Sequence, residues 1–283
     1  MGEIRADSRL NIVQVSGLAW AATCRKAAQT MLSGEDADPA ARQSSLQAQG
    51  DISPEIAEEL LRAGILDAHG VMSQQWVLAV FLAASAPLKA SSVVQFEDTE
   101  RLEETEQLTG TLLSVHTDIG LAGGRGVGVS YRRRSSHEAG GAPVTEVRNA
   151  VEVCFFQEEN AWAAISRHFP DPTLIPGSPP NPPQPTAANI GCTIHLDVSA
   201  IPSGTAQGSG YVRRHTWGVT DHLYSVEPAH GVEPARGVEP AGGEGPTASL
   251  VPVPATDIAS EFAWSLLGAR EYLASIGAGS VPA

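Results

Sequence analysis

The sequence predicts an α+β protein, and three observations lead to that prediction. Apolar residues keep a helical spacing over residues 53–85, and the spacing becomes alternating after Pro87. The glycines between 120 and 128 separate two alternating segments, which is typical of an antiparallel hairpin. A final segment over 256–276 returns to helical spacing. With 283 residues, the chain is long enough for a sizeable core in one domain or two.

The first elements are a strand over residues 10–16 and a helix over residues 18–32. Leu18, Ala22 and Cys24 give the helix its apolar spacing. A polar, turn-rich stretch follows and is predicted to be a loop.

Two helices on either side of a short turn give the clearest local signal. Ser53 is a good N-cap, and Pro54 fits the first helical position. Gly64 suits the left-handed residue that ends a helix. Ser73 is predicted to cap the second helix, which Pro87 ends. The two apolar stripes consist of Ile56, Leu60 and Leu61, then Trp76, Val77, Val80 and Phe81.

Alternating spacing predicts the strands that follow. They are expected over residues 93–96, 108–119, 127–134, 150–156 and 193–198, with a mixed pattern over 211–226. The hairpin tip lies between Gly120 and Gly128. A short helix over 160–169 ends at Pro170, and a long helix begins after Thr256.

Proline-rich stretches divide the chain into two halves. Residues 1–170 hold the helix pair and antiparallel strands, and residues 191–283 form the C-terminal half. The segment 171–190 between them is a Pro-rich linker, with eight prolines in residues 170–185. Inside the second half, residues 226–249 repeat Val-Glu-Pro-Ala three times. Since proline and glycine in each copy oppose helix and sheet, this segment is predicted to be a disordered loop.

Charge and hydropathy exclude several classes of partner. There are 32 acidic and 18 basic residues, so the net charge is −14 and a nucleic-acid partner is not expected. The longest apolar stretch, 76–86, is too short to span a bilayer, so no membrane insertion is expected. Cys24, Cys154 and Cys192 lack metal-site spacing and are expected to be free thiols in a reducing cytosol. The protein is therefore predicted to be soluble and cytoplasmic.

The local motifs do not form a catalytic constellation. The glycine-rich segment 124–128 lacks the Lys-Ser/Thr of a phosphate loop and leads into a strand. His215, Asp221 and His222 lie within eight residues and are interpreted as polar strand positions. An enzyme that uses His215 or Asp221, as a base or a metal ligand, is kept as an alternative. We expect no catalytic residues, no cofactor and no metal.

One segment carries a family resemblance. Leu60-Leu61-Arg62-Ala63-Gly64-Ile65-Leu66-Asp67-Ala68-His69-Gly70 lies between two helices, with antiparallel strands and a Pro-terminated helix after it. This order resembles the EspG family of chaperones associated with type VII (ESX) secretion in actinobacteria, which carry a similar "L…GhlD..G" segment. The resemblance covers residues 10–170, and 190–276 as a strand-then-helix order. The Pro-rich linker and the Val-Glu-Pro-Ala repeat depart from it.

The resemblance implies a fold and a function. It implies one α+β domain in which a central antiparallel sheet is flanked by helical subdomains, with pseudo-twofold symmetry between two halves. Members of the family are not enzymes. They bind PE/PPE-like secretion substrates in the cytosol, cover an apolar helical tip and keep the substrate soluble until export. The expected partner is a PE/PPE-like secreted protein or heterodimer, and a homo-oligomer is left open.

Trp264 and Leu267 are the predicted partner-binding residues. They lie off the inner apolar stripe of the last helix, which consists of Ile258, Phe262, Leu266 and Leu273. An exposed apolar pair on a helix can anchor a partner, and ordinary core packing is the alternative. A second hypothesis for the whole chain is a winged-helix transcriptional regulator with a C-terminal sensing region. Against it, residues 71–88 contain no Arg or Lys with which a recognition helix could approach DNA.

Overall fold

The structure, a computed structural model, forms one antiparallel sheet. It describes residues 10–32, 52–97, 111–136, 144–175, 190–202, 210–227 and 249–277. The strands are β1 (Asn11–Val15), β2 (Leu88–Glu97), β3 (Thr111–Ala122), β4 (Arg125–Ser136), β5 (Val144–Gln157), β6 (Cys192–Ala200), β7 (Tyr211–Val219), β8 (Leu223–Glu227) and β9 (Ser249–Val253). Their order across the sheet is β1-β5-β4-β3-β2-β6-β7-β8-β9.

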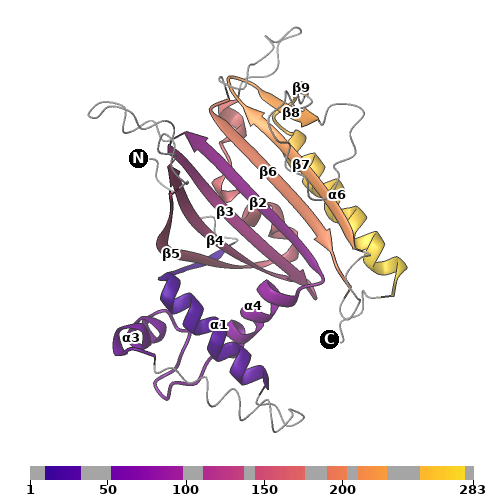
Figure 1. Cartoon of the computed structure of the whole chain (residues 1–283). Helices are drawn as coiled ribbons and strands as arrows, with labels where there is room; N and C mark the ends of the chain where they lie inside the picture. The colour runs from indigo at the N-terminus through magenta and orange to yellow at the C-terminus, as the bar shows by residue number, and fades with distance from the viewer. Residues whose placement is uncertain are drawn as a thin grey trace, which may run out of the picture.

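Helices cover parts of both faces of this sheet. They are α1 (Gly17–Leu32), α3 (Pro54–Arg62), α4 (Gln74–Ser85), α5 (Ala161–Ile165) and α6 (Asp257–Ser275). Short 3-10 turns occur at η2 (Glu158–Asn160), η3 (Ser166–His168) and η4 (Pro172–Leu174). Figure 1 shows α1, α3 and α4 gathered beside one end of the sheet, and α6 running along β7. The predicted α+β class with a large antiparallel sheet is confirmed, and the pseudo-twofold relation between halves stays a prediction.

The helix pair begins where the sequence predicts. The Ser53 hydroxyl accepts a hydrogen bond from the Ile56 N–H at 3.4 Å, and Pro54 is the first residue of α3. Ser73 precedes α4, but its side chain makes no capping hydrogen bond, so that predicted cap is wrong in detail. Thr256 likewise precedes α6 without a side-chain cap. Backbone bonds to the carbonyl oxygens of these residues start both helices instead.

The turn between α3 and α4 is fixed by two glycines and one aspartate. Gly64 and Gly70 have φ of +68° and +72°, a region that favours glycine. The Asp67 carboxylate accepts hydrogen bonds from the N–H groups of His69 and Val71, each at 2.9 Å. The resembling segment 60–70 is therefore an ordered connection.

Several predicted boundaries differ from the structure. β2 starts at Leu88 and not at 93, directly after the proline that ends α4. The expected helix over 160–169 is split into α5 and η3. Leu18 is 62% exposed, so the predicted apolar spacing of α1 is wrong there, and Ala19, Ala22 and Ala27 face the core instead. β9 was not predicted at all.

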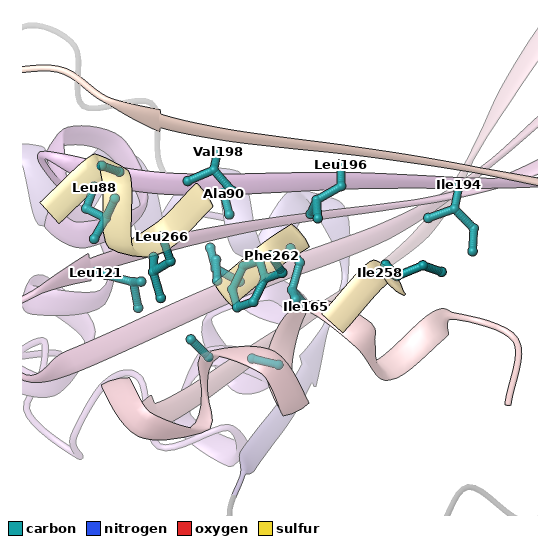
Figure 2. Close-up of a cluster of buried hydrophobic side chains, with 14 of the residues drawn as sticks. Leu88, Ala90, Leu121, Ile165, Ile194, Leu196, Val198, Ile258, Phe262 and Leu266 are labelled. Atoms are coloured by element: carbon teal, nitrogen blue, oxygen red, sulfur yellow. The ribbon is translucent and has the colours of Figure 1, made fainter. Parts of the chain in front are cut away.

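The two faces of the sheet carry separate cores. The first lies under α5 and α6, and Figure 2 shows Phe262 and Leu266 of α6 over strand residues such as Leu196 and Leu121. The second lies under α1, α3 and α4. Its buried members include Trp76, Leu60, Ile65, Met72 and Val153. Each helix of the pair buries part of the stripe that its spacing predicts, with Leu60, Trp76 and Val80 in the core. The prediction is wrong for Leu61 and Phe81, which are 45% and 43% exposed because they lie on the solvent side of their helices.

Strands from either side of the Pro-rich linker lie in the same sheet. β2 pairs with β6 from Leu88↔Ala200 to Phe96↔Cys192. Residues 176–189 of the linker and 228–248 of the repeat loop lie outside the described residues. The repeat segment leaves β8 and returns to β9 at a directly opposed pair, Glu227↔Ser249.

Candidate functional site

The predicted pair Trp264 and Leu267 lies on the outer side of α6. The inner side packs Ile258, Phe262 and Leu266 against the sheet, as the spacing predicts. Trp264 is 68% exposed and Leu267 is 44% exposed, so neither is a core residue of the described structure. Their role in binding stays a prediction.

Polar contacts with β7 hold α6 in place. The Trp217 indole N–H donates a hydrogen bond to the Asp257 carboxylate at 2.9 Å, at the first turn of the helix. Further along, His215 Nε2 lies 3.1 Å from the Ser265 hydroxyl oxygen. Side chains on the outer face of α6 are thus presented on a helix anchored at two levels.

The structure separates the candidate catalytic residues. His215 is half-buried on β7 and faces α6, where its Nε2 lies 3.5 Å from the Glu261 carboxylate. Asp221 and His222 lie in the turn between β7 and β8, and not on one strand with His215 as their spacing was interpreted. Within the described ranges, no group of three or more His, Cys, Asp or Glu side chains could hold a metal ion.

The glycine-rich segment lies at a hairpin, as predicted, but the predicted tip over 124–128 is too long because residues 125–128 already belong to β4. Gly123 and Gly124, with φ of +59° and +75°, make the turn between β3 and β4. The chain then continues as a strand and not as a helix whose N-terminus could hold phosphate. Gly126 and Gly128 face Phe156 and Cys154 so closely that a Cβ at either position would overlap them.

The three cysteines are free thiols in the structure. Cys154 is buried, while Cys24 and Cys192 are half-buried. Burial raises the pKa of the Cys154 and Cys192 thiols to about 11 and also raises that of Cys24. Protonated thiols are poor nucleophiles, so none of the three is arranged for covalent chemistry at neutral pH.

An ionic cluster between β5 and η3 is not among the sites that the sequence predicts. Arg167 pairs with Glu152, and the His168 ring lies 3.6 Å from the same carboxylate. Burial, and then the charge of Arg167, lowers the pKa of His168 to about 4 against the opposing effect of Glu152. No sequence signal could have found this cluster, because Glu152 lies fifteen residues from Arg167 on another element.

The packing of α4 bears on the winged-helix hypothesis. Trp76, Ala79 and Leu82 of α4 are buried in the core that this helix shares with α1 and the sheet. The opposite side of α4 is exposed, with Gln75, Leu78 and Phe81, but this helix contains no Arg or Lys with which a recognition helix would approach the major groove. The basic triplet Arg132–Arg134 lies on β4 and not on this helix. In the part of the chain that the structure covers, no helix is long and apolar enough to cross a membrane.

Comparison with known proteins gives likenesses among solved structures alone. The chain matches no protein-family model and no curated protein. Among solved structures it is similar to the type VII secretion system chaperone EspG5 of Mycobacterium tuberculosis, determined in complex with the PE25–PPE41 dimer. The TM-score is 0.47 at 9% sequence identity, and the match covers 92% of this chain and 96% of that one.

Proposed function

We propose that the protein is a cytosolic chaperone that binds a PE/PPE-like secretion substrate, covers its apolar helical tip and keeps it soluble for export. In this proposal it has no catalytic activity, and α6 supplies the contact surface together with a neighbouring loop of the sheet. The segment 60–70, which carries the family resemblance, supports the proposal from the sequence. The observation that carries it is the exposure of Trp264 on the outer side of α6.

The physical argument concerns an apolar surface that water contacts. Burial is what stabilises an apolar group, so an indole with 68% of its surface exposed contributes little to the stability of the fold. Covering it with an apolar partner removes that surface from water and gives the kind of aromatic anchor found at binding hot spots. Leu267, three residues on along α6, extends the same surface.

Co-expression tests the proposal. The chain is produced together with the PE/PPE-like pair encoded in its genomic neighbourhood, and soluble complex is measured by size-exclusion chromatography. We expect the substrate pair to be soluble only with this chain. Trp264→Ser is expected to weaken the complex by about 2 kcal/mol, which is about 30-fold in Kd.

A matched control separates binding from general surface hydrophobicity. Leu61 on α3 is 45% exposed and Leu267 is 44% exposed, so Leu61→Ser and Leu267→Ser remove similar exposed apolar groups. Only Leu267→Ser should weaken the complex. No soluble complex with wild-type protein, or equal effects of the two leucine variants, would count against the proposed role of α6.

A further inference from the structure

A groove of about 710 Å³ lies on the face of the sheet opposite α6. It forms where the helical layer of α1 and α4 stops and the strands β3, β2 and β6 continue. We call it the sheet-face groove. Neither the resemblance nor the candidate residues on α6 pointed to this surface.

One wall of the sheet-face groove is an apolar stripe of α1. It consists of Trp20, Cys24, Ala28 and Met31, which recur at helical spacing along one side. Met31 is 42% exposed, and Ala28 is exposed as well. At 1.5 Å per residue the stripe is about 16 Å long, or three helical turns. Its small central residues leave room for another backbone to approach closely.

The floor of the groove comes from the strands and carries polar side chains beside the apolar Val129 and Val151. Ser91 of β2, Tyr131 of β4 and Ser199 of β6 lie there with Lys89 and Asp118. Lys89 Nζ donates a hydrogen bond to the carbonyl oxygen of Ala84, near the C-terminus of α4, at 2.6 Å. The lysine is therefore already engaged with its own fold.

Asp118 is different, because within the described ranges its carboxylate has no hydrogen-bond or ion-pair partner. Partial burial raises the pKa of the Asp118 carboxyl group, against the opposing effect of the Lys89 and Arg133 charges, which lower it. The side chain is nevertheless open to solvent, since it lies in a groove and not in the core. A cation brought by a partner would stabilise the ionised carboxylate.

We propose that the sheet-face groove binds an amphipathic helix of about three turns from a partner protein, with its apolar side on the α1 stripe and a lysine or arginine at Asp118. The α1 stripe offers an apolar contact surface three helical turns long, and its small residues allow two helices to pack closely. The unpaired carboxylate of Asp118 favours a basic residue on the partner. The groove and α6 lie on opposite faces of the sheet, so this surface does not depend on the proposed role of α6.

Defined peptides test the proposal without a natural partner. The probe is a stapled helical peptide of about 14 residues, with leucines at i, i+4 and i+7 and one lysine beside them. A second peptide carries glutamate in place of that lysine. Binding to the full chain is measured by fluorescence anisotropy, and we expect saturable binding of the lysine peptide and binding at least about 10-fold weaker for the glutamate peptide.

Variants locate the binding. Ala28→Trp fills the groove from an exposed position and should abolish binding. Thr30→Trp places the same side chain on the opposite, exposed side of α1 and should leave it unchanged. Asp118→Asn should reduce the preference for the lysine peptide over the glutamate peptide to less than about twofold. No binding of either peptide, or binding that Ala28→Trp leaves intact, overturns the proposal.

Discussion

The indole of Trp217 and the carboxylate of Asp257 are joined by a hydrogen bond of 2.9 Å that fastens the start of α6 to β7. The indole ring is almost fully buried, with 1% exposure. Its N–H therefore cannot donate a hydrogen bond to water, and a buried donor without a partner costs free energy. The same carboxylate lies in the first turn of α6, where a negative charge interacts favourably with the helix dipole.

Removing this carboxylate should destabilise the fold. We expect Asp257→Ala to lower the free energy of unfolding by about 2 kcal/mol, because it leaves the Trp217 N–H unsatisfied and removes the favourable charge. Urea unfolding followed by tryptophan fluorescence measures the change. Glu271→Ala, at an exposed position on the same helix, is the control and should change the value by less than about 0.5 kcal/mol. Similar values for the two variants would contradict the role given to Asp257.

A second prediction concerns the contact between β3 and α4. A Cβ at Gly120 would overlap the carbonyl oxygen of Leu82 and lie 2.8 Å from its carbonyl carbon. Because the obstacle is helix backbone and not a flexible side chain, Gly120→Ala should separate α4 from the sheet and cost about 3 kcal/mol. Gly191→Ala is the control, since a Cβ there meets nothing within 4 Å. A Gly120→Ala protein as stable as the wild type by chemical denaturation would show that α4 can shift freely.

The elements that the sequence predicts correctly are those with residues typical of a helix end or with alternating apolar residues. Ser53 and Pro54 mark the start of a helix through their own side chains, and Gly64 marks its end because the lack of a Cβ allows a positive φ. The structure places α3 between them. The alternation of Val151, Val153 and Phe155 likewise predicts one buried side of β5 correctly. Its other side is buried too, through Cys154 and Phe156. Each of these signals depends on a few neighbouring residues, so the element can be predicted without knowing its tertiary contacts.

The missed elements depend on their neighbours. The start of β2, Leu-Lys-Ala-Ser-Ser, has little intrinsic strand preference and becomes a strand because β3 and β6 pair with it on both sides. β9 contains Pro252, which lowers any strand prediction, yet an edge strand tolerates it. The exposure of Trp264 agrees with its position off the inner stripe. The sheet-face groove instead joins α1 to strands that are distant in the sequence, from Lys89 of β2 to Ser199 of β6, and has no sequence signature.

We expect the ionic cluster around His168 to make the free energy of unfolding depend on pH. The pKa of His168 is lowered to about 4 in the fold from an ordinary value of 6.5. Between these values the unfolded chain binds a proton that the folded chain does not, so the stabilisation is complete above pH 6.5 and is lost as the pH falls towards 4. The loss should reach about 3 kcal/mol.

His168→Gln tests this origin of the pH dependence. Glutamine does not titrate, so the free energy of unfolding should fall less steeply between pH 6.5 and pH 4 in the variant than in the wild type. Urea titrations at four pH values measure the slope. His69→Gln, in the turn between α3 and α4, should retain the wild-type slope. An unchanged slope in His168→Gln would assign the pH dependence to other groups.

The last prediction concerns the repeat segment between β8 and β9. Glu227 and Ser249, the described residues on either side of 228–248, are directly opposed in the sheet. An Asn-Gly turn could therefore replace the whole segment and join the strands as a tight hairpin. Closing a loop of two residues instead of 21 should stabilise the fold by about 2 kcal/mol, and substrate binding should be retained. Urea unfolding and the co-expression assay measure both effects.

A Gly/Ser segment of the original length is the control for loop length and should leave stability unchanged. If the shortened protein lost its substrate while the Gly/Ser control kept it, the length of the loop would be required for binding. Loss of binding in both proteins would instead assign a binding role to the Val-Glu-Pro-Ala sequence itself.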